Sequence, residues 1–176
     1  MRELEVKVLN IDVTEWAAKL EAKGAVKLSE ERQKNFIFDL PRDCLAGYLR
    51  IRSYHDVFHG EKKSLLTLKK KIKHETLREH MEIETEISDP DAMYEILREL
   101  GYAAKHINIK DRISYTFRGA RFDLDTWEEA VGLPPYMEIE VESEAHLEEL
   151  IQELNIDREW ITNRSIRDFL EEKDAK

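Results

Sequence analysis

Apolar and charged residues alternate in three short stretches of the chain. The stretches read ELEVKV (residues 3–8), HMEIETEI (80–87) and YMEIEVES (136–143). A period of two places the apolar residues on one face of a β-strand and the charged residues on the other face. Each stretch therefore predicts a strand with one apolar and one acidic face.

A helical pattern follows each of these strands, which suggests a weak internal repeat of a strand and a helix. The helices are predicted within residues 12–24, 88–101 and 144–155. Asp12 is a typical N-cap because Glu15 follows three residues later, and Ser88 or Asp89 can cap the second helix. The first two patterns end at a glycine, which is a common helix stop.

Four further stretches alternate in the same way: 48–54, 65–72, 107–115 and 121–127. Their polar faces carry the pairs Arg50/Arg52, Lys69/Lys71, Lys110/Arg112 and Asp123/Asp125. Any single strand of this kind fits an ordinary sheet with one face toward water. Basic pairs that alternate with acidic pairs favour instead a sheet closed on itself around a charged lumen, with helices on its apolar outside. The outer face is expected to include Leu4, Leu49, Leu68, Ile109 and Ile139.

Composition limits the class of protein. The 176 residues are 41% hydrophobic and 38% charged, which is typical of one globular domain. The sequence contains no apolar run near the roughly 18 residues of a membrane span, and its N-terminus lacks the apolar region of a signal peptide. Cys44 is the only cysteine, which fits a reducing, cytoplasmic location. The net charge of −10 argues against a nucleic-acid or anionic-membrane partner.

The opening segment Glu3-Leu4-Glu5-Val6-Lys7 resembles the E-x-E-x-K signature of the CYTH superfamily, also called triphosphate tunnel metalloenzymes. The resemblance continues in order through LRIR, LTLKK, REHMEIE, IKDRISY and FDLDTWEEAVGLPPYMEIE. It implies an α+β fold in which a closed or nearly closed, eight-stranded antiparallel β-barrel forms a tunnel, with the helices packed outside. Residues 1–176 would then form a single CYTH-like domain.

The basic side chains suit a polyanion, because arginine grips phosphate oxygens in pairs and lysine supplies point charges. The expected phosphate ligands are Arg50, Arg52, Lys69, Lys110 and Arg112, followed by Lys7, Lys71 and Arg78. The resemblance implies that carboxylates bind Mg²⁺ or Mn²⁺, the expected ligands being Glu3, Glu5, Glu138 and Glu140. Three roles are open for Glu82, Glu84 and Asp125: a second metal, orientation of water, or pairing with the basic rows. The residues expected in the catalytic step are Glu3, Glu5, Lys7, Glu82 and Glu84.

The predicted function is metal-dependent hydrolysis of inorganic triphosphate or of a small organic triphosphate such as ATP or thiamine triphosphate. A class IV adenylyl cyclase is the alternative, and a non-catalytic binding module is a third. Either a monomer or a homodimer is compatible with the sequence. The C-terminal segment departs from the family pattern. Many members have a tyrosine there that helps to close the tunnel, whereas Ile166 follows Ser165 in this chain.

Overall fold

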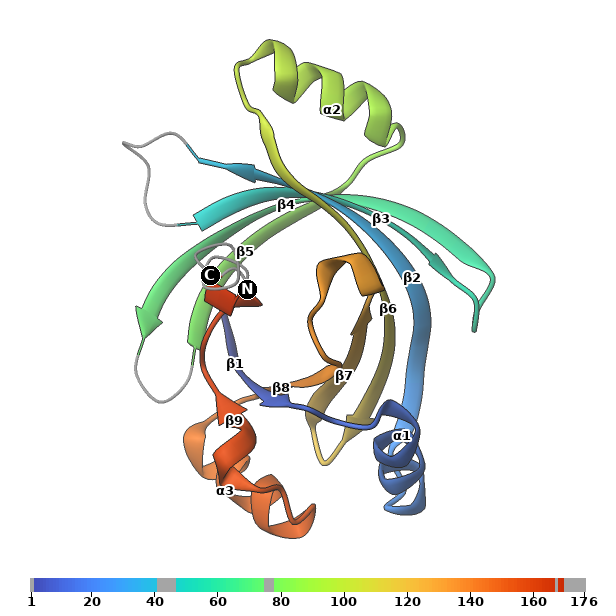
Figure 1. Cartoon of the computed structure of the whole chain (residues 1–176), viewed down its shortest axis with the longest axis vertical. Coiled ribbons are helices and arrows are strands. Elements are labelled where there is room, and N and C mark those ends of the chain that lie inside the picture. The colour runs from blue at the N-terminus through green and yellow to red at the C-terminus, as the bar shows by residue number, and fades with distance from the viewer. Residues whose placement is uncertain (1, 41–46, 75–77, 167, 170–176) are drawn as a thin grey trace.

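The computed structural model describes residues 2–40, 47–74, 78–166 and 168–169. Within this part of the chain, nine strands form one antiparallel sheet, and three α-helices accompany it (Figure 1). The strands are β1 (Arg2–Leu9), β2 (Val26–Asp39), β3 (Gly47–Asp56), β4 (Glu61–His74), β5 (Arg78–Glu86), β6 (Ala104–Phe117), β7 (Ala120–Trp127), β8 (Tyr136–Val141) and β9 (Ile161–Thr162). The predicted α+β class is confirmed.

The spatial order of the strands is β5-β4-β3-β2-β6-β7-β8-β1-β9. β1 also pairs with β5, the first strand in this order, with Leu4 opposite Glu79 and Glu5 opposite Arg78. The ninth strand, which the sequence pattern did not predict, is a two-residue strand beside β1. In Figure 1 the long strands arch around a central space, and the helices lie outside the arch.

Each predicted strand–helix repeat is confirmed. Helices α1 (Val13–Ala22), α2 (Pro90–Glu99) and α3 (Glu144–Glu153) follow β1, β5 and β8. The side chain of Asp12 accepts a hydrogen bond from the backbone N–H of Glu15, and Asp89 caps α2. None of the helices in the described part of the chain is long and apolar enough to span a membrane.

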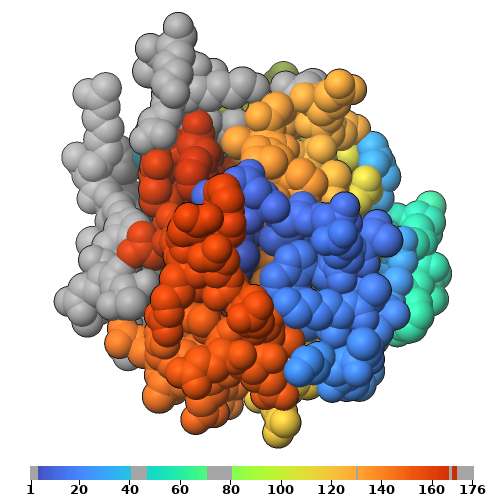
Figure 2. Space-filling model, turned by 60° about the horizontal axis from the view of Figure 1, so that its bottom comes forward, coloured from blue at the N-terminus to red at the C-terminus, as the bar shows by residue number. Residues whose placement is uncertain are grey.

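Two apolar clusters hold the helices against the outside of the sheet. In the larger one, Leu20 of α1 and Leu150 of α3 are buried together with Ile139 of β8. In the smaller one, Leu97 of α2 is buried with Phe38 and Ile51. Full burial of such a side chain contributes about 1.5–3 kcal/mol. Figure 2 shows the face that the N-terminal (blue) and C-terminal (orange to red) segments form together.

Helix cover of the predicted outward face is confirmed for three of its five members. Leu4 and Ile139 belong to the larger cluster, and Leu49 packs against the smaller one. Leu68 and Ile109 are half-buried and belong to neither cluster, contrary to the expectation that helices cover them. Three helices of ten residues each are too short to cover the whole outside of so long a sheet.

Candidate functional site

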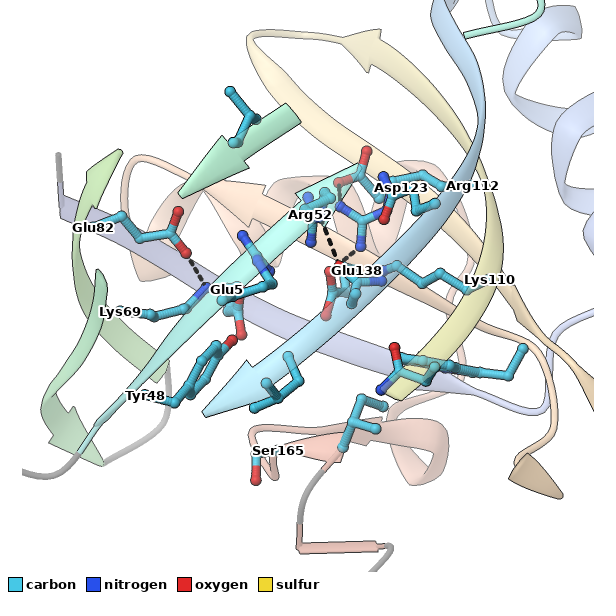
Figure 3. A pocket seen from close by; sticks show the side chains of 18 of the residues that line it. Glu5, Tyr48, Arg52, Lys69, Glu82, Lys110, Arg112, Asp123, Glu138 and Ser165 are labelled. Atoms are coloured by element: carbon cyan, nitrogen blue, oxygen red, sulfur yellow. Dashed lines mark hydrogen bonds and ion pairs between the residues drawn. The ribbon is translucent and has the colours of Figure 1, made fainter. Parts of the chain in front are cut away.

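A cavity of about 660 Å³ is lined by alternate residues of the strands and by part of the C-terminal segment (Figure 3). Most of the predicted site residues line it: Glu5, Lys7, Arg50, Arg52, Lys69, Glu82, Glu84, Lys110, Arg112, Glu138 and Glu140. Asp125 is fully buried below its surface. The side chains of Glu3, Lys71 and Arg78 lie outside the described part of the structure.

Arg112 forms the centre of a buried ion-pair network on one wall. Its guanidinium donates to both carboxylate oxygens of Asp125, at 2.7 and 2.6 Å, and also to Asp123 and Glu138. Although burial alone would lower it, these carboxylates raise the pKa of Arg112. All three guanidinium nitrogens are therefore already engaged with protein carboxylates.

Asp125 is equally constrained. Lys110 donates to it at 2.6 Å in addition to Arg112. Burial would raise the pKa of Asp125, but Arg112 and Lys110 lower it. Of the three roles left open for this residue, pairing with the basic rows is the one that its contacts favour.

Arg50 and Arg52 on β3 have a different environment. Arg52 donates from Nε to Asn35 at 3.0 Å, and no ion pair joins it to a carboxylate of the described residues. Burial, together with Arg50 and Arg112, lowers the pKa of Arg52 to about 10. Arg50 is 8% exposed, and its Nε has no hydrogen-bond partner among the described residues. Neither guanidinium group therefore forms an ion pair with a carboxylate of the described residues.

Glu5 and Glu140 face each other across the pairing of β1 with β8, and both line the cavity. Glu5 is 4% exposed, with Lys7 at 3.2 Å and Lys69 at 3.7 Å. Glu138 pairs with Lys7 at 3.0 Å as well as with Arg112. Burial would raise the pKa of Glu138, but Lys7 and Arg112 hold it well below its ordinary value.

The two carboxylates of β5 contact β4. Glu82 pairs with Lys69 at 2.6 Å, and Glu84 accepts a hydrogen bond from Thr67 at 2.7 Å. Burial would raise the pKa of Glu82, but Lys69 and Arg50 lower it. Pairing with the basic rows is therefore seen for Glu82, whereas Glu84 binds a neutral hydroxyl.

These contacts decide which carboxylates could hold a metal ion. Among the described residues, no three His, Cys, Asp or Glu side chains are arranged as a metal-binding group. Mg²⁺, however, is usually bound by only one or two carboxylates together with water and substrate phosphates. Glu5 and Glu140 fit this requirement, because their carboxylates come from paired positions and line the same cavity. Asp125 fits it poorly, since its oxygens already accept hydrogen bonds from Lys110 and Arg112.

Sequence reasoning missed a neutral set of cavity residues. They are Gln33 and Asn35 of β2, Tyr48 of β3, His106 and Asn108 of β6, and Trp127 of β7. The only sequence signal for most of them was their place at alternate positions along a strand. Asn108, for example, alternates with Lys110 and Arg112 along β6. The C-terminal Ser165 and Ile166 also line the cavity, although the expected tyrosine is absent there.

Comparison with known proteins identifies solved structures that are similar to this fold. A search of curated proteins found no match. Among solved structures, the PH1819 protein of Pyrococcus horikoshii is 27% identical, with a TM-score of 0.76 over 97% of this chain and 99% of that one. A conserved hypothetical protein of Pyrococcus furiosus is 26% identical, with a TM-score of 0.77 over 96% and 98%.

A third solved structure carries a description of activity. HpAC1 from Hippeastrum, an adenylyl cyclase candidate described as having a dominant triphosphatase activity, is 22% identical, with a TM-score of 0.68 over 97% of this chain and 96% of that one. At this identity the likeness shows a shared fold. The family model of the CYTH domain matches residues 1–165. The chain therefore belongs to the CYTH domain family.

Proposed function

We propose that this protein is a divalent-metal-dependent hydrolase of a triphosphate, which binds inside an eight-stranded tunnel closed by the pairing of β1 with β5. The chain would act as a single domain. The observation that carries the proposal is the pair Arg50, which is buried, and Arg52, which is half-buried, neither of which forms an ion pair with a carboxylate among the described residues. Buried charges are stable only when they are paired, so an anion is the missing partner.

Each cavity wall would have its own part in binding. Arg50 and Arg52 would grip phosphate oxygens with their guanidinium groups. Lys7, Lys69 and Lys110 would add point charges, and Lys71 and Arg78 are proposed to extend the same basic rows. Arg112 would contribute mainly by holding its carboxylate partners in place, because its own nitrogens are already engaged.

Glu5 and Glu140, with Glu3, are the proposed carboxylates for Mg²⁺ or Mn²⁺. Glu138 would join them only by giving up its contacts with Lys7 and Arg112. When bound, such a cation offsets phosphate charge and makes water a better nucleophile. In the reaction, water adds to the terminal phosphorus while the phosphoanhydride bond breaks, which releases orthophosphate and a diphosphate. The residues of the chain would position the groups and stabilise charge, which is most of the catalysis that phosphoryl transfer needs.

Class IV adenylyl cyclase activity is the second candidate. The neutral residues beside the arginines favour it, because they offer room and hydrogen bonds for more than a bare phosphate chain. A product assay separates the two reactions. Inorganic triphosphate, ATP and thiamine triphosphate are each incubated with Mg²⁺ and with Mn²⁺, and the products are identified. Orthophosphate indicates hydrolysis, whereas cyclic AMP with pyrophosphate indicates cyclisation.

Replacing Arg52 with Ala tests the proposed anion site. A charged hydrogen bond contributes about 1.5–3 kcal/mol, so the affinity for inorganic triphosphate should fall about ten- to a hundredfold. Arg52→Lys should recover only part of it, because an ammonium cannot form the bidentate contact. Titration calorimetry gives the dissociation constants. The matched control is Arg32→Ala on β2, where the side chain is 54% exposed and pairs with Asp111 and Glu128. Equal affinities for the wild type and Arg52→Ala would contradict an anion site at β3.

The pH dependence of binding provides a separate check. Burial, followed by repulsion from Arg112, lowers the pKa of Lys110 to about 8. Below that pH the ammonium attracts phosphate, and above it the lysine must take up a proton before it can do so. The contribution of Lys110 to affinity should therefore fall by up to about tenfold for each pH unit above 8.

The measurement is calorimetric titration of inorganic triphosphate at pH 7 and at pH 9. Lys110→Met serves as the reference, because subtracting its pH dependence removes the titration of the ligand itself. If the wild type and Lys110→Met lose affinity in parallel, Lys110 has no part in binding.

A further inference from the structure

The side chain of Asn35 has one hydrogen-bond partner in the described structure, and that partner is Arg52. Asn35 lies on β2 directly opposite Arg52 of β3, and its Oδ1 accepts from Arg52 Nε at 3.0 Å. Its Nδ2 has no hydrogen-bond partner among the described residues, and the residue is only 2% exposed. Burying a carboxamide whose N–H groups find no acceptor costs stability relative to an apolar side chain. A residue that carries this cost and contacts only Arg52 is expected to act through Arg52.

The contact leaves one edge of the Arg52 guanidinium open. A guanidinium is a planar fork in which Nε lies at the base and the two Nη atoms form the tip. Neither Nη atom of Arg52 forms a hydrogen bond with a described residue. Neither is one of the enclosed polar atoms that lack a partner, so both keep accessible surface. Figure 3 shows the Arg52 side chain in the cavity, where the tip of the fork can bind two phosphate oxygens.

The acceptor that holds Arg52 is neutral, in contrast to the acceptors of two other arginines in the sheet. Arg112 of β6 donates to Asp125. Arg32 of β2 donates to Asp111. A carboxylate orients a guanidinium but also neutralises it, whereas a carboxamide orients the group and leaves its charge in place. Although its pKa is lowered to about 10, Arg52 is still charged at neutral pH.

We propose that Asn35 is a positioning residue, which fixes the guanidinium of Arg52 for a phosphate chain without cancelling its charge. The inference rests on the proposed function and deepens it, because it states how the anion site keeps a charged fork both ordered and available. Groups that are ordered before binding give higher affinity, since the ligand does not have to order them. An aspartate has the same shape as asparagine and would hold Arg52 more firmly, yet it should impair binding.

The test is calorimetric titration of inorganic triphosphate, without metal, into variants of Asn35. Asn35→Asp should weaken binding about ten- to a hundredfold, as Arg52→Ala does, because the carboxylate occupies the charge that phosphate needs. Asn35→Leu and the smaller Asn35→Ala remove the acceptor without adding charge and should weaken binding about two- to tenfold. Gln152→Glu, on the exposed face of α3, is the control for changing an amide to a carboxylate. Urea unfolding shows that each variant is folded.

Two further measurements separate positioning from a purely structural role. In an Arg52→Ala background, Asn35→Leu should change the affinity by no more than about twofold, because its effect passes through the missing guanidinium. In nitrogen-15 NMR spectra, the Nε–H signal of Arg52 is identified by its absence from Arg52→Ala. This signal should move toward that of a solvated arginine in Asn35→Leu, and it should not do so in Asn35→Asp.

The positioning role is refuted if Asn35→Leu and Asn35→Ala bind triphosphate as tightly as the wild type. An unmoved Nε–H signal refutes it too, as does an equal loss of affinity with and without Arg52. Wild-type affinity in Asn35→Asp would show that the acceptor need not be neutral, which overturns the inference as stated. In each of these cases a weakened Arg52→Ala leaves the proposed function standing. If Arg52→Ala itself binds normally, the anion site at β3 fails, and the role of Asn35 fails with it.

Discussion

Replacing Glu5 with Gln is expected to lower triphosphate hydrolysis in Mg²⁺ or Mn²⁺ by at least about a hundredfold, since losing several kcal/mol of charge stabilisation costs that much. The amide keeps the shape of the side chain but loses the charge that a hard cation needs. Glu140→Gln should behave in the same way, because Glu140 is paired with Glu5 across β1 and β8. Steady-state rates over a range of metal concentrations give the result.

Measuring triphosphate binding to Glu5→Gln without metal shows whether the variant has lost affinity for the metal ion or for the substrate. Glu5 lies within 3.2 Å of Lys7 and 3.7 Å of Lys69, so removing its charge leaves two ammonium groups less neutralised. The affinity of Glu5→Gln for inorganic triphosphate without metal should therefore be retained or increased. Glu149→Gln, on the exposed face of α3, controls for the loss of one negative charge. A Glu5→Gln rate within a few-fold of the wild type would exclude Glu5 as a ligand.

The parts of the fold that the sequence predicted well share a strong local signal. β1, β5 and β8 each alternate apolar and acidic residues, and each is followed by a helix with a side-chain cap. Alternation also predicts the side of the sheet on which each side chain lies, because successive residues of a strand point to opposite sides. This explains why Glu5, Arg52 and Lys69 were expected in one lumen and line one cavity.

β2 had no such signal. Its central segment SEERQKN is polar at every position, so no apolar face marks it as a strand. The structure shows the reason: Gln33 and Asn35 are buried in the cavity, whereas Arg32 and Lys34 lie on the outer side of the sheet and line a different groove. A strand between a polar cavity and a polar exterior has no apolar periodicity. The neutral residues of β2 were missed together with the strand.

The sequence also did not predict which charged side chains of the cavity form ion pairs with one another. Arg52 and Arg112 look equivalent there, since each is the second basic residue of an alternating pair. In the structure, β6 lies beside β7, so Arg112 is directly opposite Asp125. β3 lies between β2 and β4, where Arg52 is opposite Asn35 and Leu65. Strand order, which depends on contacts distant along the chain, therefore decides that one arginine is ion-paired with carboxylates and the other is not.

This difference predicts opposite consequences for the two arginines. Arg112→Met is expected to lower the free energy of unfolding by about 3–5 kcal/mol at pH 7, because it leaves buried carboxylates without their partner. Asp123 and Asp125 are 1% and 0% exposed, so water cannot replace the guanidinium. Arg52→Met should cost far less, since it leaves no carboxylate unpaired, yet it should lose triphosphate affinity as Arg52→Ala does. Urea unfolding of both variants gives the comparison.

The pH dependence of the stability lost in Arg112→Met identifies the cause of that loss. Despite burial, Arg112 and its neighbours hold the pKa values of Asp125 and Glu138 below their ordinary range in the wild type. These carboxylates therefore stabilise the wild type at neutral pH, and this stabilisation is lost as the pH falls through their lowered pKa values. In Arg112→Met, burial should raise the same pKa values, so protonation near pH 4 relieves the unpaired charge. The gap in stability between the two proteins should then shrink from pH 7 to pH 4. A gap that is constant with pH would mean that Arg112 stabilises the fold by packing rather than by charge.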